Sequence, residues 1–239
     1  MSIEALAHLP EQGPPDLLYL LFHGVGATAE HMAPLAQRLA REYPQAAVLC
    51  LNGPERFDAV IGDAPAYQWF SIRRIDDANR PARVAAALPG FIATVRALQA
   101  RFGIGWERTA LAGFSQGAIM ALEAVQAEPQ LAGRVLAFSG RHLGAPAHIP
   151  ADTTVHLFHG RDDAVIPYRA SVESAQCLLA LGGDVTADVL PDIGHELHPA
   201  LIDKAIDQLR TFLPKRVWRE VMSEAPVLPR AASSDELGG

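Results

Sequence analysis

The chain has 239 residues, of which 49% are hydrophobic, so it can bury one large core or two small ones and is not disordered throughout. It carries 27 Asp and Glu against 20 Lys and Arg, a net charge of −7. A negative surface of this kind repels nucleic-acid phosphates and anionic lipids, so neither is an expected partner.

The amino-terminal residues contain no basic segment followed by an apolar run, and no apolar run elsewhere is long enough to span a membrane. The two cysteines, Cys50 and Cys177, lack the spacing of a metal or redox motif, so we expect two reduced thiols. These features together favour a cytoplasmic protein without a membrane span.

Short apolar runs along the chain predict buried strands. They cover residues 17–22, 46–51, 109–112, 134–138, 154–158 and 185–190. Segments with helical periodicity lie between them, at 29–41, 82–102, 116–127, 168–181 and 199–212. Alternating strands and helices of this kind predict an α/β fold, with a doubly wound, mostly parallel sheet and flanking helices.

The whole chain, residues 1–239, reads as a single domain without a linker, with its core at about 17–214. One connection, residues 52–81, has about thirty residues rich in Gly, Pro, Asp and aromatics, and its length makes it a candidate wall of a site. The chain becomes polar after Pro214, and a tail at about 224–239 is expected to be loosely ordered.

The segment LLFHGVGATAE, residues 20–30, allows two interpretations. Residues 24–29 fit the dinucleotide fingerprint G-x-G-x-x-A, and with His23 they also fit the H-G-x-G turn that presents a backbone N–H to an oxyanion. A dinucleotide site needs an acid at the end of the second strand, where this chain has Asn52, with Glu55 beyond a proline. The oxyanion turn is therefore favoured, and His23 either orients it or simply ends the strand.

Residues 113–117, GFSQG, form a G-x-S-x-G motif between a predicted strand and a predicted helix. In such a turn the serine oxygen is exposed at the sheet edge beside a helix N-terminus, which favours developing negative charge. Ser115 is therefore the candidate nucleophile.

A serine nucleophile needs an imidazole base and a carboxylate, which follow it in the order acid, then histidine, in this kind of fold. Of the nine histidines, His195 and His198 come after both the serine and a strand-end acid, and His195 lies in the loop after the last strand. His198 begins a helix and is expected to cap it. Asp162 and Asp163 are both suitable acids on the residues alone. The segment His195 to His198 is one residue short of the zinc motif H-E-x-x-H, so no metal is expected.

Taken together, these motifs resemble the phospholipase/carboxylesterase family of α/β hydrolases, which includes the acyl-protein thioesterases, and within it the small bacterial esterases of the YpfH type. The resemblance runs from about Leu17 to Pro214. It is carried by LLFHGVG, QWFS, GFSQGAIMALE, HGRDDAVIP and GGDVTADVLPDIGHEL.

The resemblance implies a set of site residues. It assigns Ser115 as nucleophile, Asp163 rather than its neighbour as acid, and His195 as base. The oxyanion donors would be the backbone N–H groups of Val25 and Gln116, and the implied substrate contacts are Trp69, Phe70 and Phe114. Trp69 and Phe70 equally fit an aromatic cluster that packs the long loop. Many relatives have W-F-D where this chain has Ser71, so a substrate contact of that aspartate is expected to be missing here.

The expected function is that of a serine hydrolase that cleaves carboxylic esters through an acyl-enzyme, without a cofactor. The connection between residues 138 and 154 is too short for a helical lid, so we expect no cap domain and a preference for small, soluble or short-acyl esters. Alternatives are an acyl-protein thioesterase or lysophospholipase and, from another class, a non-catalytic ligand-binding α/β module. A homodimer is compatible with the sequence.

Overall fold

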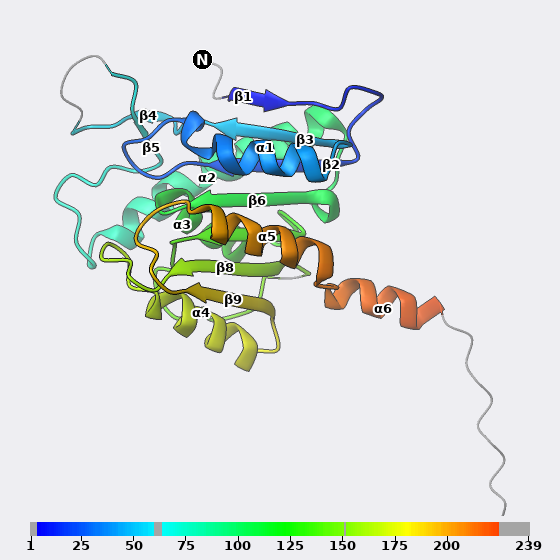
Figure 1. Ribbon diagram of the computed structural model, residues 1–239. Coiled ribbons are helices and arrows are strands. Elements are labelled where there is room, and N and C mark those ends of the chain that lie inside the picture. The colour runs from blue at the N-terminus through cyan, green and yellow to red at the C-terminus, as the bar shows by residue number, and fades with distance from the viewer. Residues whose placement is uncertain (1–3, 60–63, 151, 225–239) are drawn as a thin grey trace, which may run out of the picture.

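A seven-stranded sheet forms the centre of the computed structural model, which describes residues 4–59, 64–150 and 152–224 (Figure 1). The strand order is β1-β3-β2-β6-β7-β8-β9. Within this described sheet, the pairing of β1 with β3 is antiparallel and the other pairings are parallel. The strands are β1 (Glu4–His8), β2 (Leu17–Phe22), β3 (Ala46–Leu51), β6 (Thr109–Phe114), β7 (Arg134–Phe138), β8 (Thr154–Gly160) and β9 (Asp184–Leu190). The expected doubly wound, mostly parallel sheet is confirmed.

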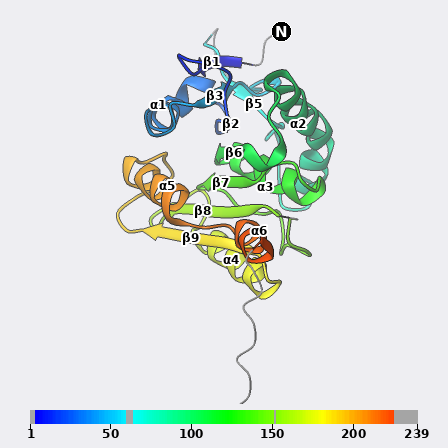
Figure 2. The ribbon, with the colours of Figure 1, turned by 90° about the vertical axis from the view of Figure 1, so that its right-hand side faces the viewer.

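Helices cover both faces of this sheet (Figure 2). Helices α1 (Ala33–Glu42) and α5 (Pro199–Thr211) pack on one face. Helices α2 (Arg80–Phe102), α3 (Gln116–Ala127) and α4 (Arg169–Ala180) pack on the other. In the described residues of the connection between β7 and β8 there is no helix, so no helical cap stands over this part of the sheet edge.

Strand β2 shows why the predicted strands are continuously apolar. Leu18, Leu20 and Phe22 point toward α2 and α3, whereas Tyr19 and Leu21 point toward α1 and α5. All five side chains are buried, because alternate residues of a strand point to opposite faces and both faces are covered. Each such side chain stabilises the fold by roughly 1.5–3 kcal/mol.

The predicted helix at 29–41 is divided in the structure. A 3-10 turn, η1 (Ala29–Met32), leads into α1, which begins at Ala33. Pro34 explains the division, because proline has no N–H to donate and is tolerated in the first turn of an α-helix but not inside it. The other predicted helices and strands lie within two residues of the observed bounds.

Several elements were not predicted. Strand β1 lies before the expected core and α6 (Lys215–Glu224) after it. The long loop contains the two-residue strands β4 (Glu55–Arg56) and β5 (Tyr67–Gln68), and η2 (Trp106–Arg108) precedes β6. These elements are short, so they are stabilised by contacts with the rest of the fold rather than by a hydrophobic pattern in their own sequence. The expected loose tail lies outside the described residues except for its first residue. No described helix has both the length and the apolar character needed to cross a membrane.

The turn from β6 into α3 brings three backbone segments into contact. A Cβ atom on Gly117 would overlap the carbonyl oxygen of Phe22 at the end of β2, and one on Gly113 would overlap the first turn of α3. Only glycine fits at these two positions. The glycines of G-x-S-x-G therefore let α3 start directly against β2, next to the segment that follows Phe22.

We expect Gly117→Ala to lower the free energy of unfolding by about 2 kcal/mol or more, because the added methyl group meets backbone that cannot move aside. The matched control is Gly90→Ala, on the exposed surface of α2 with no atom within 4 Å of the new Cβ. This change should stabilise the protein by roughly 0.5–1 kcal/mol, the helix preference of alanine over glycine. Urea denaturation measures both, and equal midpoints for the two variants would contradict the close contact.

Candidate active site

Ser115 lies at the junction of β6 and α3 with a backbone conformation that L-amino acids rarely adopt, φ +52° and ψ −112°. Its N–H donates to the carbonyl oxygen of Phe138 at 2.9 Å, which continues the pairing of β6 with β7 beyond the strand. The residue is 7% exposed. A non-glycine residue in this region stores strain, and the surrounding contacts hold it with its hydroxyl at the sheet edge.

Three strand ends bring a serine, a histidine and an aspartate into one line of hydrogen bonds. His195 Nε2 lies 2.9 Å from Ser115 Oγ, and His195 Nδ1 lies 2.7 Å from Asp163 Oδ2. A carboxylate only accepts, so Nδ1 carries the ring hydrogen and the unprotonated Nε2 faces the serine hydroxyl. This is the arrangement in which an imidazole can take the proton of a serine.

Asp163 is buried, and both of its carboxylate oxygens accept hydrogen bonds. Oδ1 accepts from the backbone N–H groups of Val165 and Ile166, each at 2.8 Å, and Oδ2 accepts from His195. Burial alone would raise the pKa of this carboxyl group, but the hydrogen bonds from His195, Ile166 and Val165 outweigh it and hold the pKa below its ordinary value. Asp163 is therefore ionised at neutral pH.

The neighbouring acid, Asp162, is exposed and contributes its backbone N–H to the carbonyl oxygen of Ile193. Of the two acids that the residues alone left open, only Asp163 contacts His195. His198 is the N-cap of α5, and its Nδ1 accepts the N–H of Ala200 at 3.1 Å, as expected for a capping residue.

The H-G-x-G segment forms a tight turn in which the Ala27 N–H donates to the Gly24 carbonyl oxygen at 3.3 Å. Gly26 has φ +74°, the value that a type II turn requires at its third residue. The Gly26 N–H is bound to the carbonyl oxygen of Tyr67 at 2.8 Å. Among the described residues, the Val25 N–H has no hydrogen-bond partner and is free to bind an added group.

This turn lies against the nucleophile. A Cβ on Gly24 would be 3.4 Å from Ser115 Cβ and 3.0 Å from the Phe114 ring, so a larger residue here would press on the Phe114 ring. The Gln116 N–H, at the first position of α3, has no partner inside its helix because no carbonyl precedes it by four residues there. The two predicted oxyanion donors thus belong to two backbone segments that adjoin Ser115.

His23 is fully buried and is hydrogen-bonded to the turn. Its Nε2 accepts the N–H of Gly53 at 2.9 Å, and Nδ1 lies 2.6 Å from the Gly24 carbonyl oxygen, to which it therefore donates. Burial lowers the pKa of this imidazole to about 4, so the ring is neutral at pH 7. Of the two readings left open for His23, the structure favours the one in which it orients the turn.

The Gln116 side chain ties the nucleophile segment to the long loop. Its Oε1 accepts the N–H of Trp69 at 2.8 Å, and its Nε2 donates to the carbonyl oxygen of Phe70 at 2.7 Å. The sequence predicts a role only for the Gln116 backbone. The glutamine therefore holds residues 69 and 70 against the start of α3, although they lie 46 to 47 residues from Gln116 in the chain.

The Trp69 side chain is largely buried in the core. Its ring packs edge-on against Phe22 and Phe91, and its Nε1–H donates to the His23 carbonyl oxygen at 2.9 Å. Trp69 and Phe70 are each 5% exposed. This placement fits the alternative in which the aromatic pair packs the long loop, and their role in substrate binding stays a prediction.

Phe114 lies beside the reacting groups. Its ring centroid is 5.0 Å from that of His195 and 5.1 Å from that of His31. His31, in η1, was not singled out in the sequence, because no motif in this helix-like segment marks it. Partial burial and the proximity of His195 lower the pKa of His31, which keeps this ring neutral near the site.

A carboxylate lies next to Ser71, the position where the resemblance leads one to expect an aspartate. The Ser71 hydroxyl donates to Asp58 of the long loop, and Arg83 donates to the Ser71 carbonyl oxygen at 2.7 Å. Position 71 has no carboxylate of its own, but the carboxylate of Asp58, from elsewhere in the long loop, lies next to it.

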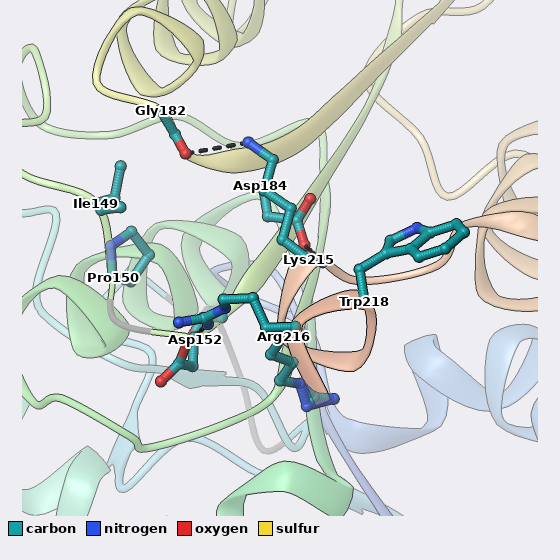
Figure 3. A pocket seen from close by; sticks show the side chains of 10 residues that line it. Ile149, Pro150, Asp152, Gly182, Asp184, Lys215, Arg216 and Trp218 are labelled. Atoms are coloured by element: carbon teal, nitrogen blue, oxygen red, sulfur yellow. Dashed lines mark hydrogen bonds and ion pairs between the residues drawn. The ribbon is translucent and has the colours of Figure 1, made fainter. Parts of the chain in front are cut away.

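A hollow of about 790 Å³ lies beside α6, and none of the residues that line it belongs to the serine, histidine and aspartate group (Figure 3). Trp218 forms one of its walls. Lys215 Nζ donates to the Gly182 carbonyl oxygen at 3.1 Å, and Arg219 pairs with Asp152. These cations are engaged in holding α6 to the body of the protein, so the hollow is not the candidate site.

The position where a dinucleotide site needs an acid is occupied by an asparagine that binds backbone. Asn52, at the end of the second parallel strand, uses its Oδ1 to accept the Ala29 N–H at 2.8 Å and so caps η1. The described His, Cys, Asp and Glu residues form no group of three that could hold a metal ion.

Comparison with known proteins places these features in a family. The model of the phospholipase/carboxylesterase family matches residues 9–213. The esterase YpfH of Escherichia coli K12 is 43% identical over 210 residues, which covers 88% of this chain and 89% of the relative. An acyl-protein thioesterase 1 from Gibberella zeae is 33% identical over 122 residues, covering 48% of this chain and 52% of the relative.

Solved structures agree with this assignment. The crystal structure of esterase PE8 superposes with a TM-score of 0.79 at 29% identity, covering 89% of this chain and all of that one (100%). The fold is that of the α/β hydrolases, and the chain belongs to the phospholipase/carboxylesterase family.

Proposed function

We propose that this protein is a serine hydrolase that cleaves carboxylic esters through an acyl-enzyme on Ser115. The observation that carries the proposal is the continuous line of hydrogen bonds from Ser115 Oγ through His195 to Asp163. Membership of the phospholipase/carboxylesterase family and 43% identity to an esterase support the same chemistry. A non-catalytic binding module would have no need to align these three side chains.

In the first half-reaction His195 Nε2 takes the hydroxyl hydrogen as Ser115 Oγ attacks the ester carbonyl carbon. The resulting imidazolium is stabilised by ionised Asp163, which lies 2.7 Å from Nδ1. The imidazolium then gives its proton to the departing alcohol, and the acyl group stays on Ser115. In the second half-reaction His195 takes a proton from water, which attacks the acyl-enzyme; the imidazolium returns that proton to Ser115 Oγ as the bond to the acyl group breaks and the acid leaves.

Negative charge develops on the carbonyl oxygen during each attack. The N–H groups of Val25 and Gln116 are the proposed donors to it. The first has no hydrogen-bond partner in the described part of the chain, and the second begins a helix whose dipole favours an anion. The tight turn of residues 24–27 is anchored to Tyr67, so the Val25 N–H is oriented before substrate arrives.

The proposed substrates are small, soluble or short-acyl esters, because the described part of the β7–β8 connection contributes no helical lid over the sheet edge. Thioesters are the second candidate, supported by the similarity to acyl-protein thioesterase 1, and lysophospholipids stay an untested alternative. A homodimer also stays a prediction.

Hydrolysis of acyl esters and thioesters of graded chain length tests the proposed reaction, with Ser115→Ala as the blank. We expect short esters to be cleaved fastest and Ser115→Ala to lower kcat by about 10⁶, because the nucleophile is lost. A fluorophosphonate should label the wild type and not this variant. The control is Ser139→Ala, since Ser139 is also a buried strand-end serine with positive φ, yet its Oγ has no partner among the described residues. Labelling of Ser115→Ala would refute the assignment.

The acid is tested by exchanging each aspartate for asparagine. Asp163→Asn should lower kcat by roughly 10⁴, because an amide no longer holds His195 in the tautomer that accepts from serine. Asp162→Asn removes one charge from the same loop, but its side chain is exposed and should leave kcat close to that of the wild type. Steady-state kinetics with a short ester decide, and the opposite ranking would assign the other carboxylate.

The oxyanion donor is tested at Val25, the second residue of the type II turn, a position that proline favours. Val25→Pro should therefore keep the turn while it deletes the N–H, and kcat should fall by about 10² to 10³. Val25→Ala keeps the N–H and should stay within about tenfold of the wild type. Circular dichroism checks the fold, and a folded Val25→Pro enzyme with full turnover would exclude Val25 as a donor.

A further inference from the structure

The sequence LFHG occurs twice, at residues 21–24 and 157–160, and each copy ends a parallel strand with a fully buried histidine. The first, His23, orients the turn that carries Val25. The second, His159 in β8, has no role in the mechanism above, although it lies four residues before Asp163 and is in contact with it.

The hydrogen-bond partners of His159 determine which nitrogen carries hydrogen. Nε2 lies 2.8 Å from the carbonyl oxygen of Ile166 and 3.1 Å from Asp163 Oδ2. A carbonyl oxygen and a carboxylate only accept, so Nε2 must be protonated and donates to both. The ring therefore presents an N–H to the same Asp163 oxygen that binds His195.

The other ring nitrogen is held by α4. Nδ1 lies 2.7 Å from Ser171 Oγ, and this hydroxyl is also 3.1 Å from the Gly140 carbonyl oxygen. Burial lowers the pKa of His159. In the neutral ring the single Ser171 hydrogen is shared between Nδ1 and the Gly140 carbonyl oxygen, which both accept it. Ser171 thereby fixes the plane of the ring and aims Nε2 at Asp163.

We propose that His159 is a positioning residue that holds the Asp163 carboxylate in the orientation His195 needs. The backbone amides of Val165 and Ile166 hold only Oδ1. Among the described residues, His195 would be the one side-chain donor left to Oδ2 if His159 were absent. His195 is the residue that Asp163 must orient, so it cannot also serve as the support of Asp163. With it, Oδ2 is held from a second side by a rigid, buried ring.

The second donor also changes the charge on Oδ2. A hydrogen bond from His159 draws negative charge from the oxygen, which then stabilises the protonated form of His195 less strongly. Removing this donor should therefore favour protonated His195, and a higher pH is then needed to generate the free base. Among the described titratable groups, Asp163 interacts with both His159 and His195, His31 interacts with His195, and the two imidazoles His159 and His195 interact with one another. Only position 159 changes in the variants below.

The inference rests on the proposed function of Ser115, His195 and Asp163, and kinetics of His159→Met test it. This side chain has a similar length but no N–H donor. We expect kcat to fall roughly 10- to 100-fold, the rate factor that corresponds to the free energy of one hydrogen bond to a charged group. KM should stay close to that of the wild type. The rise of kcat/KM with pH should move to higher pH. In His159→Gln a side-chain amide can donate in place of Nε2, so both quantities should return toward the wild type.

His156→Met is the matched control. His156 lies in the same strand and is as fully buried, but its ring contacts Arg134 and Thr186 rather than Asp163. A purely structural role for His159 would make the two methionine variants alike, with lower stability and an unchanged pH profile. That result would overturn the proposal. Activity that persists in Ser115→Ala would instead overturn the proposed function itself, so the two failures are distinguishable.

The wild-type protein supplies a test that does not depend on the variants folding. Nitrogen-15 NMR of protein labelled at histidine reports which ring nitrogen is protonated. The proposal requires a hydrogen on Nε2 of His159, in either the neutral or the protonated ring. A neutral ring with its hydrogen on Nδ1 could not donate to Asp163 and would refute the proposal.

Discussion

The close backbone contact between Gly117 and the end of β2 is the constraint on which the site depends. Because α3 starts against the carbonyl oxygen of Phe22, the chain that follows β2 must turn directly beside Ser115. The same contact places the start of α3 next to the segment that carries Val25. Ser115 and the backbone segments of the two proposed oxyanion donors thus meet at one packing contact.

The second element of the site is a carboxylate buried away from water. Burial disfavours the charge of Asp163, and the structure offsets this cost with two backbone amides on Oδ1 and two imidazoles on Oδ2. A buried charge with this many donors has little freedom to reorient. Its rigidity is transmitted to His195, whose hydrogen bond to Asp163 keeps Nε2 directed at Ser115.

Much of this site could be predicted, because loops after parallel strands meet at one sheet edge whatever their distance in the chain. That rule brings Ser115, His195 and the acidic loop together from their order alone. It does not say which of two adjacent acids turns inward. Asp163 does so because the amides of the two residues after Ala164 point at its carboxylate, a loop conformation without a sequence pattern of its own.

The sequence by itself determined the alternation of strands and helices, since apolar periodicity reflects which faces are buried, and it marked the strained turn at Ser115 through its two glycines. Only the tertiary structure decided which groups His159 and the Gln116 side chain contact, and that residues 4–8 and 215–224 form β1 and α6. A histidine near a strand end has the same local pattern whether it fills the core, caps a turn or donates to Asp163. What distinguishes these roles is the identity of neighbours brought from other strands, and hydrogen-bond geometry between them exists only once the sheet is assembled.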